Sequence, residues 1–188
     1  GRWRATDERA AADVPASLAE IVARRLEAVP AAERDVLDGA CVQGPSFDVR
    51  ILARALDRPL LAVLAALVPL SRALRLVRGE GRPREFAPPV VQEVLWKALD
   101  PARRTDLHAR TAEALASAEA AGDLPRAKAA PRIVGQFLLG GRADRAAPLL
   151  VEALDGLLAR CRNSEALELT TLALANGPSA LEPAVRTR

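Results

Sequence analysis

Apolar residues recur at helical spacing from residue 15 onward, and prolines divide them into short segments. The first segment predicts an amphipathic helix over residues 15–29, and Pro30 ends that helix and begins a second one. Asp48 and Asp57 each stand where a helix N-cap is expected, so two further short helices are predicted after them. The fourth predicted helix is apolar on all sides, which is typical of a buried helix, and its pattern changes after Pro69.

The stretch that follows has the pattern of a β-hairpin. Leu74, Leu76 and Val77 lead to the turn Gly79-Glu80-Gly81, and residues 84–87 lead away from it. Short helices followed by a hairpin form the element order of a winged helix-turn-helix domain. We therefore predict such a domain over residues 14–87.

Every segment from residue 88 onward has helical periodicity. Breaks are expected at Pro101, Gly122 and Gly140, with a further interruption at Pro131. The last two segments are similar at an offset of twenty residues: Arg142, Ala146, Leu149, Ala153 and Leu154 correspond to Arg162, Ala166, Leu169, Ala173 and Leu174. This similarity is typical of tetratricopeptide-like arrays. We predict antiparallel helical hairpins over residues 88–188, in an array that continues beyond this segment.

Residues 1–13 are predicted to be the end of a preceding module, with Trp3 anchoring a strand, and a linker. The whole chain has three Phe, two Trp and no Tyr, so Ala, Leu and Val must fill its interior. This composition favours a mainly α fold of closely packed helices. The longest run of low charge, residues 59–71, is too short to cross a bilayer. We expect a cytoplasmic protein without membrane association, in which Cys41 and Cys161 are buried thiols.

The motifs of common enzyme sites are absent from the sequence. It contains no G-x-x-x-x-G-K-[ST] P-loop, no GxGxxG, no GxSxG and no HExxH. The single histidine, His108, lies on a charge-rich helix and is expected to be a solvated or interhelical side chain. Asp35 and Asp38 are expected to be solvating charges rather than an acid–base pair. The segment is therefore predicted to be non-catalytic, with no cofactor and no metal.

The net charge of +3 is concentrated in residues 71–85, which contain five arginines against two acids. These arginines are candidates for contact with phosphates or with an acidic partner: Arg72, Arg75, Arg78, Arg82 and Arg84. Such contacts position a protein on DNA but do not read its sequence. Beyond Arg58 the fourth helix has no side chain that reads base edges. We therefore favour a solvated or protein-docking hairpin, and expect the helix to dock on another module through Leu60, Leu61, Leu64 and Leu67.

Two stretches carry a resemblance to a known family. VPASLAEIVARRLEAVPAAERDVLDGACVQGPSF (residues 14–47) and FAPPVVQEVLWKALDPARRTDLHARTAEAL (residues 86–115) resemble the region that follows the ATPase module in STAND-type signalling NTPases. Within the second stretch Phe86, Glu93 and Trp96 fit the pattern of that family. The histidine that senses nucleotide in some members corresponds to Pro88 here, so that role does not carry over.

The resemblance implies a regulatory arm of a larger ATP-dependent signalling or transcription regulator. ATP or ADP would bind the upstream module, on which the winged helix would dock, and the repeats would sense a partner protein or ligand. Two alternatives remain open: a DNA-binding transcription regulator that uses the basic hairpin, and a free-standing helical-repeat scaffold. The apolar fourth helix also predicts self-association of the isolated segment, because large exposed apolar patches mark interaction sites.

Overall fold

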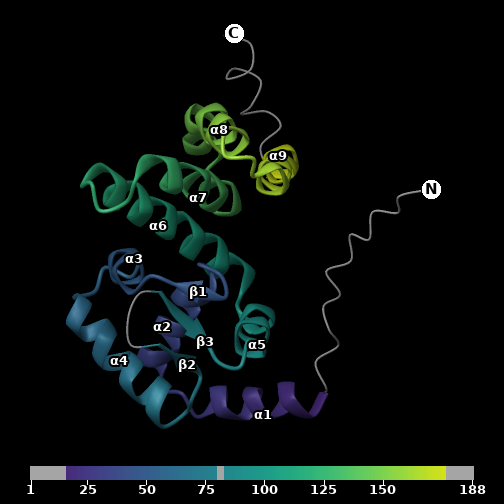
Figure 1. Ribbon diagram of the computed structural model, residues 1–188. Helices are drawn as coiled ribbons and strands as arrows, with labels where there is room; N and C mark the ends of the chain where they lie inside the picture. The colour runs from purple at the N-terminus through teal and green to yellow at the C-terminus, as the bar shows by residue number, and fades with distance from the viewer. Residues whose placement is uncertain (1–15, 80–82, 177–188) are drawn as a thin grey trace.

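A computed structural model describes residues 16–79 and 83–176 of the chain (Figure 1). This part is mainly helical with a small antiparallel sheet, which confirms the predicted mainly α class. Its elements are α1 (Ala16–Glu27), α2 (Ala31–Cys41), β1 (Ser46–Phe47), α3 (Val49–Ala55), α4 (Leu60–Arg72), β2 (Val77–Arg78), β3 (Arg84–Phe86), α5 (Val90–Ala98), α6 (Pro101–Ala120), α7 (Arg126–Leu139), α8 (Ala143–Leu158) and α9 (Asn163–Asn176). The predicted strand around Trp3 and the linker lie outside the described residues.

Two helix starts show side-chain capping, one of them at a predicted cap. The Asp48 carboxylate, predicted as an N-cap, accepts a hydrogen bond from the backbone N–H of Arg50 at 2.7 Å, at the start of α3. Asp100, which was not predicted as a cap, accepts from the N–H of Arg103 at 3.0 Å, at the start of α6. The prediction that Asp57 caps the fourth helix is wrong, because Asp57 has a positive φ of 52° and Pro59 is the N-cap residue of α4.

Two prolines that were expected to break helices lie inside them. Helix α4 continues through Pro69 to Arg72, and α7 continues through Pro131 to Leu139. The carbonyl of Pro69 accepts the N–H of Ala73 at 3.0 Å, so the helical hydrogen bonding resumes beyond the proline. Each proline removes only its own N–H from the ladder, and tertiary packing of both helices holds them together.

The hairpin prediction is confirmed, and a third strand joins it. Strands β2 and β3 pair antiparallel with Val77 opposite Phe86, and β1 pairs antiparallel with the other edge of β3. The strand order is therefore β1-β3-β2. The rings of Phe47 and Phe86 lie 5.4 Å apart between centroids, so an aromatic pair anchors the sheet in the core.

The buried apolar side chains form two clusters. The first lies among α1 to α5 and the sheet and includes Leu107 of α6, and the second lies among α6 to α9 and includes Ile51 and Ala55 of α3. Helix α3 packs against α6, as Figure 1 shows, so it belongs to both clusters. The predicted boundary before residue 88 assigns α5 to the second unit, whereas Val91 and Leu95 of α5 lie in the first cluster. In the part of the chain that the structure covers, no helix has both the length and the apolarity needed to cross a membrane.

Candidate functional site

Helix α4 has one buried side and one exposed side, although its sequence is apolar all round. Val63, Leu67 and Leu70 are fully buried in the first cluster. Of the four leucines predicted to dock on another module, Leu67 is therefore buried in the chain's own core and is not available for docking. Leu64 packs partly against that core, Leu60 is 36% exposed, and Leu61 is 80% exposed.

The exposed side of α4 is a continuous apolar stripe. Leu61, Ala65 and Val68 follow one another at a spacing of four and three residues, so they lie on the same face of the helix. We call these three residues the α4 outer face. Val68 is 48% exposed and Ala65 is also exposed. Burying such a stripe against a partner would release ordered water, so the α4 outer face is a candidate interaction surface.

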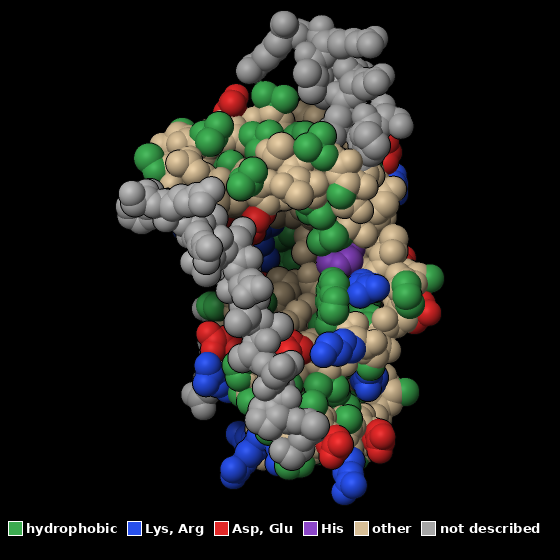
Figure 2. Space-filling model, turned by 90° about the vertical axis from the view of Figure 1, so that its right-hand side faces the viewer, with side chains coloured by type: hydrophobic (Ala, Val, Ile, Leu, Met, Phe, Trp, Pro, Cys, Tyr) green, Lys and Arg blue, Asp and Glu red, His purple; other side chains and the backbone are tan. Residues whose placement is uncertain are grey.

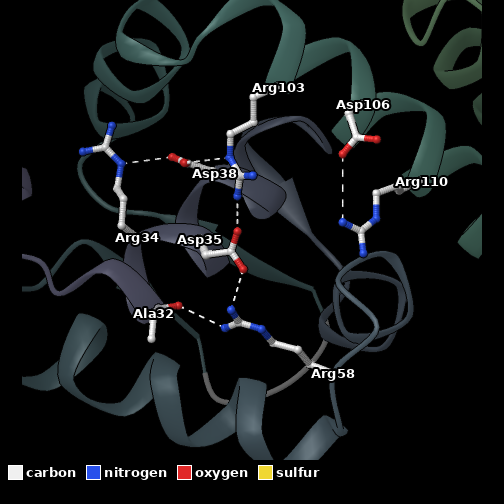
Figure 3. A network of polar contacts seen from close by, with 8 residues as sticks. All are labelled: Ala32, Arg34, Asp35, Asp38, Arg58, Arg103, Asp106 and Arg110. Atoms are coloured by element: carbon white, nitrogen blue, oxygen red, sulfur yellow. Dashed lines mark hydrogen bonds and ion pairs between the residues drawn. The ribbon is translucent and has the colours of Figure 1, made fainter.

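The one basic residue at the start of this helix points back into the protein. The Arg58 guanidinium pairs with the Asp35 carboxylate at 2.6 Å and donates a hydrogen bond to the carbonyl of Ala32 at 3.1 Å. Figure 3 shows Arg58 directed toward the second helix. Arg58 is therefore engaged within the fold, and a base edge would have to compete with a carboxylate for it.

Asp35 belongs to an ion-pair network that joins α2, the segment before α4, and α6 (Figure 3). Arg103 of α6 pairs with both Asp35 and Asp38, and Arg34 pairs with Asp38 at 3.0 Å. The Asp38 side chain is only 11% exposed. The prediction that these two carboxylates are solvating charges is therefore wrong. Each accepts from guanidinium groups, as structural ion pairs do.

A weak sequence signal for this network exists. Asp35 and Asp38 are three residues apart, so they lie on one face of α2. Their partners Arg58 and Arg103 are distant in sequence, and only the packing of α6 on the first cluster brings them together.

The predicted basic hairpin does not present a uniform basic surface. Arg72 and Arg75 are exposed and form no ion pair with another described residue. Arg78 donates to the Glu85 carboxylate across the hairpin at 2.8 Å. Arg84 is half-buried, and its Nε has no hydrogen-bond partner among the residues that the structure describes. Arg82 lies outside the described residues.

His108 connects the two clusters. Its side chain is 3% exposed, and its Nδ1 lies 2.7 Å from the Oε1 atom of Gln136 on α7. The Gln136 amide in turn donates to the carbonyl of Val42 at 3.0 Å, just after α2. Trp96 of α5 meets the imidazole at a steep angle, with 5.7 Å between ring centroids. The interhelical alternative predicted for His108 is therefore confirmed, and burial lowers its pKa below 6.5.

The two cysteines differ in their surroundings. Cys41 is buried, and burial raises the pKa of its thiol to about 12, so it remains a protonated, unreactive group at neutral pH. Cys161 is exposed, which corrects the prediction that both thiols are buried. Within residues 16–79 and 83–176, no group of His, Cys, Asp and Glu side chains is arranged to hold a metal ion.

Comparisons with known proteins add no relative. No family model, no curated protein and no solved structure matches this chain.

Proposed function

We propose that this chain is the non-catalytic regulatory and protein-interaction arm of an ATP-dependent signalling or transcription regulator of the STAND type. In this proposal the α4 outer face docks on the ATPase module, and α6 to α9 bind a signalling partner. The observation that carries the proposal is the α4 outer face, an apolar stripe left exposed on a helix whose other side is fully buried.

The arrangement of elements supports the winged-helix part of the proposal. The order α2, β1, α3, α4, β2, β3, with a small antiparallel sheet in the order β1-β3-β2, is compatible with a helix-turn-helix domain that carries a hairpin wing. In DNA-binding domains of this kind the last helix before the hairpin reads bases with polar side chains. Here α4 offers Leu61, Ala65 and Val68 instead, which suit a protein surface.

The second half supports the tetratricopeptide-like part. Helix α7 packs against both α6 and α8, and α9 packs against α7 and α8, so each helix adds to its predecessors as in a helical solenoid. The α3–α6 packing and the Arg103 ion pairs fasten this array to the first half. The array thus contacts α2 and α3, and these two helices also pack against α4.

DNA binding is the less favoured function. Arg58 is held by Asp35, and Arg78 is held by Glu85, so two of the basic side chains nearest to α4 and the hairpin are already paired. Arg72 and Arg75 would supply a salt-dependent attraction to phosphates without sequence readout.

A photo-crosslinking experiment in the native protein tests the docking surface. A photoreactive amino acid replaces Leu61 on the α4 outer face, and in a matched control it replaces Leu167, an exposed leucine of α9. We expect the Leu61 position to crosslink to the P-loop module in the absence of a signal, and the Leu167 position not to do so. Equal crosslinking at both positions, or crosslinking of Leu61 to duplex DNA, would overturn the proposal.

A further inference from the structure

A groove of about 490 Å³ lies where the end of α2 meets α5, α6 and α7. Its walls include Val42, Gln92, Trp96, His108 and Leu139. Figure 2 shows this face of the molecule, with the only histidine, in purple, beside a hollow between the two halves. The volume falls within the range of small-molecule sites in proteins, and most of the wall is apolar.

The hydrogen bonds around His108 fix which of its nitrogens carries the proton. Gln136 donates from its Nε2 to the carbonyl of Val42, so its Oε1 is the atom that faces His108 Nδ1. An amide oxygen can only accept, and therefore Nδ1 is the protonated nitrogen. In the neutral ring the other nitrogen, Nε2, is then a hydrogen-bond acceptor.

This acceptor has no partner in the described protein. Nε2 of His108 is buried and makes no hydrogen bond, which is unfavourable for a polar atom that has lost its contact with water. Trp96 is only half-buried, lies edge-to-face against the imidazole and lines the same groove as His108, so the groove adjoins the histidine ring. Arg104 lies over the Trp96 ring at 4.7 Å and Lys97 lines the groove, so the rim is polar.

We propose that this groove binds a small organic ligand with an apolar, flat body and one hydroxyl or N–H group that donates to His108 Nε2. The apolar body would pack against Trp96 and Leu139, and the donor would satisfy the buried acceptor. Because α2 and α5 belong to the first cluster, and Leu139 ends a helix of the second, the ligand would bridge both halves. Ligand binding in this groove is separate from the proposed docking function and does not depend on the α4 outer face.

The test compares 2-naphthol with 2-methoxynaphthalene, which has the same body but no donor. The readout is the imidazole nitrogen spectrum of the ¹⁵N-labelled chain, in which the single histidine gives one assignable pair of signals. We expect 2-naphthol to bind at least about 10-fold more tightly than 2-methoxynaphthalene, because it adds one hydrogen bond to a buried acceptor. We also expect it to shift the Nε2 signal. Without any probe, the spectrum should show Nδ1 protonated.

Two variants sharpen the comparison. His108→Phe should abolish the preference for 2-naphthol, whereas Glu93→Gln, at the rim of the same groove, should preserve it. Equal affinity for both probes, an unshifted Nε2 signal on adding 2-naphthol, or a wild-type spectrum with Nδ1 unprotonated would each overturn the proposal. The probe-induced shift and the resting spectrum are measured on the wild-type chain, so they decide the matter even if His108→Phe does not fold.

Discussion

Replacing Gly140 by alanine should force α6 and α7 apart. A Cβ atom at Gly140 would lie 2.6 Å from the backbone nitrogen of Ala109 and 2.7 Å from its Cα. Carbon atoms in contact normally stand about 3.5–4.0 Å apart, so α7 would have to move by roughly 1 Å. The obstacle is backbone in the middle of α6, which cannot turn away as a flexible side chain can.

Such overpacking costs about 1–3 kcal/mol, which for a chain of this size lowers Tm by about 2–12 °C. The control is Gly156→Ala in α8, where the new methyl would meet only Arg160 Nη2 at an ordinary 3.8 Å. That change should raise stability by about 0.5–1 kcal/mol, because alanine favours helix over glycine. Thermal unfolding, monitored by circular dichroism, measures the Tm of both variants.

The result bears on the groove as well as on stability. Ala109 follows His108 directly, so a displaced α7 would also lengthen the contact between His108 and Gln136. If Gly140→Ala were as stable as the wild type, the close approach of α6 and α7 would be refuted, and with it the placement of His108 against Gln136.

Three further predictions concern pH, the ion pairs and the α4 outer face. The unfolded chain protonates His108 at its ordinary pKa of 6.5 and the folded chain only at lower pH. Stability should therefore fall as the pH drops below 6.5, by at most about 1.4 kcal/mol per pH unit, and level off below the folded pKa. Measured by urea unfolding, the His108→Gln variant should lack this loss of stability below pH 6.5. A pH dependence identical to that of the wild type would contradict a buried, neutral His108 ring. Asp38→Asn should cost about 1.5–3 kcal/mol, because two arginines lose a shielded negative charge and the amide keeps only one of the two acceptor oxygens. Glu113→Gln, in an exposed ion pair with Arg145, should cost less than about 1 kcal/mol. Equal losses of unfolding free energy for the two variants, measured by urea unfolding, would refute the distinction between a shielded and an exposed ion pair. Light scattering should show that the isolated chain self-associates. Leu61→Glu should make it monomeric, whereas Leu174→Glu, at another exposed leucine, should not. A monomeric wild type at high concentration would contradict the role of the α4 outer face as an interaction surface.

The elements that depend on local pattern were predictable, and those that depend on distant partners were not. Periodicity and capping located the helices, and the glycine-rich turn located the hairpin. Strand β1 has only two residues, and its extended form is fixed by pairing with β3, some forty residues away. Pro69 was misinterpreted as a break because the packing that holds α4 together is tertiary.

The candidate site divides in the same way. The apolar character of α4 was visible in the sequence, but which leucines face outward depends on where the core lies, so Leu61 and Leu67 could not be distinguished. The burial of Asp38 depends on Arg103 arriving from α6, and the fixed tautomer of His108 depends on Gln136 arriving from α7. No local pattern contains those contacts.

The size and peptide map of the native polypeptide test the central proposal most directly. An antibody raised against this chain would capture the protein from its own cells, and mass spectrometry would give its length and sequence. The regulatory-arm proposal predicts a polypeptide much longer than this 20.0 kDa chain, with a G-x-x-x-x-G-K-[ST] motif on its N-terminal side. A native polypeptide of about 20.0 kDa without that motif would contradict it.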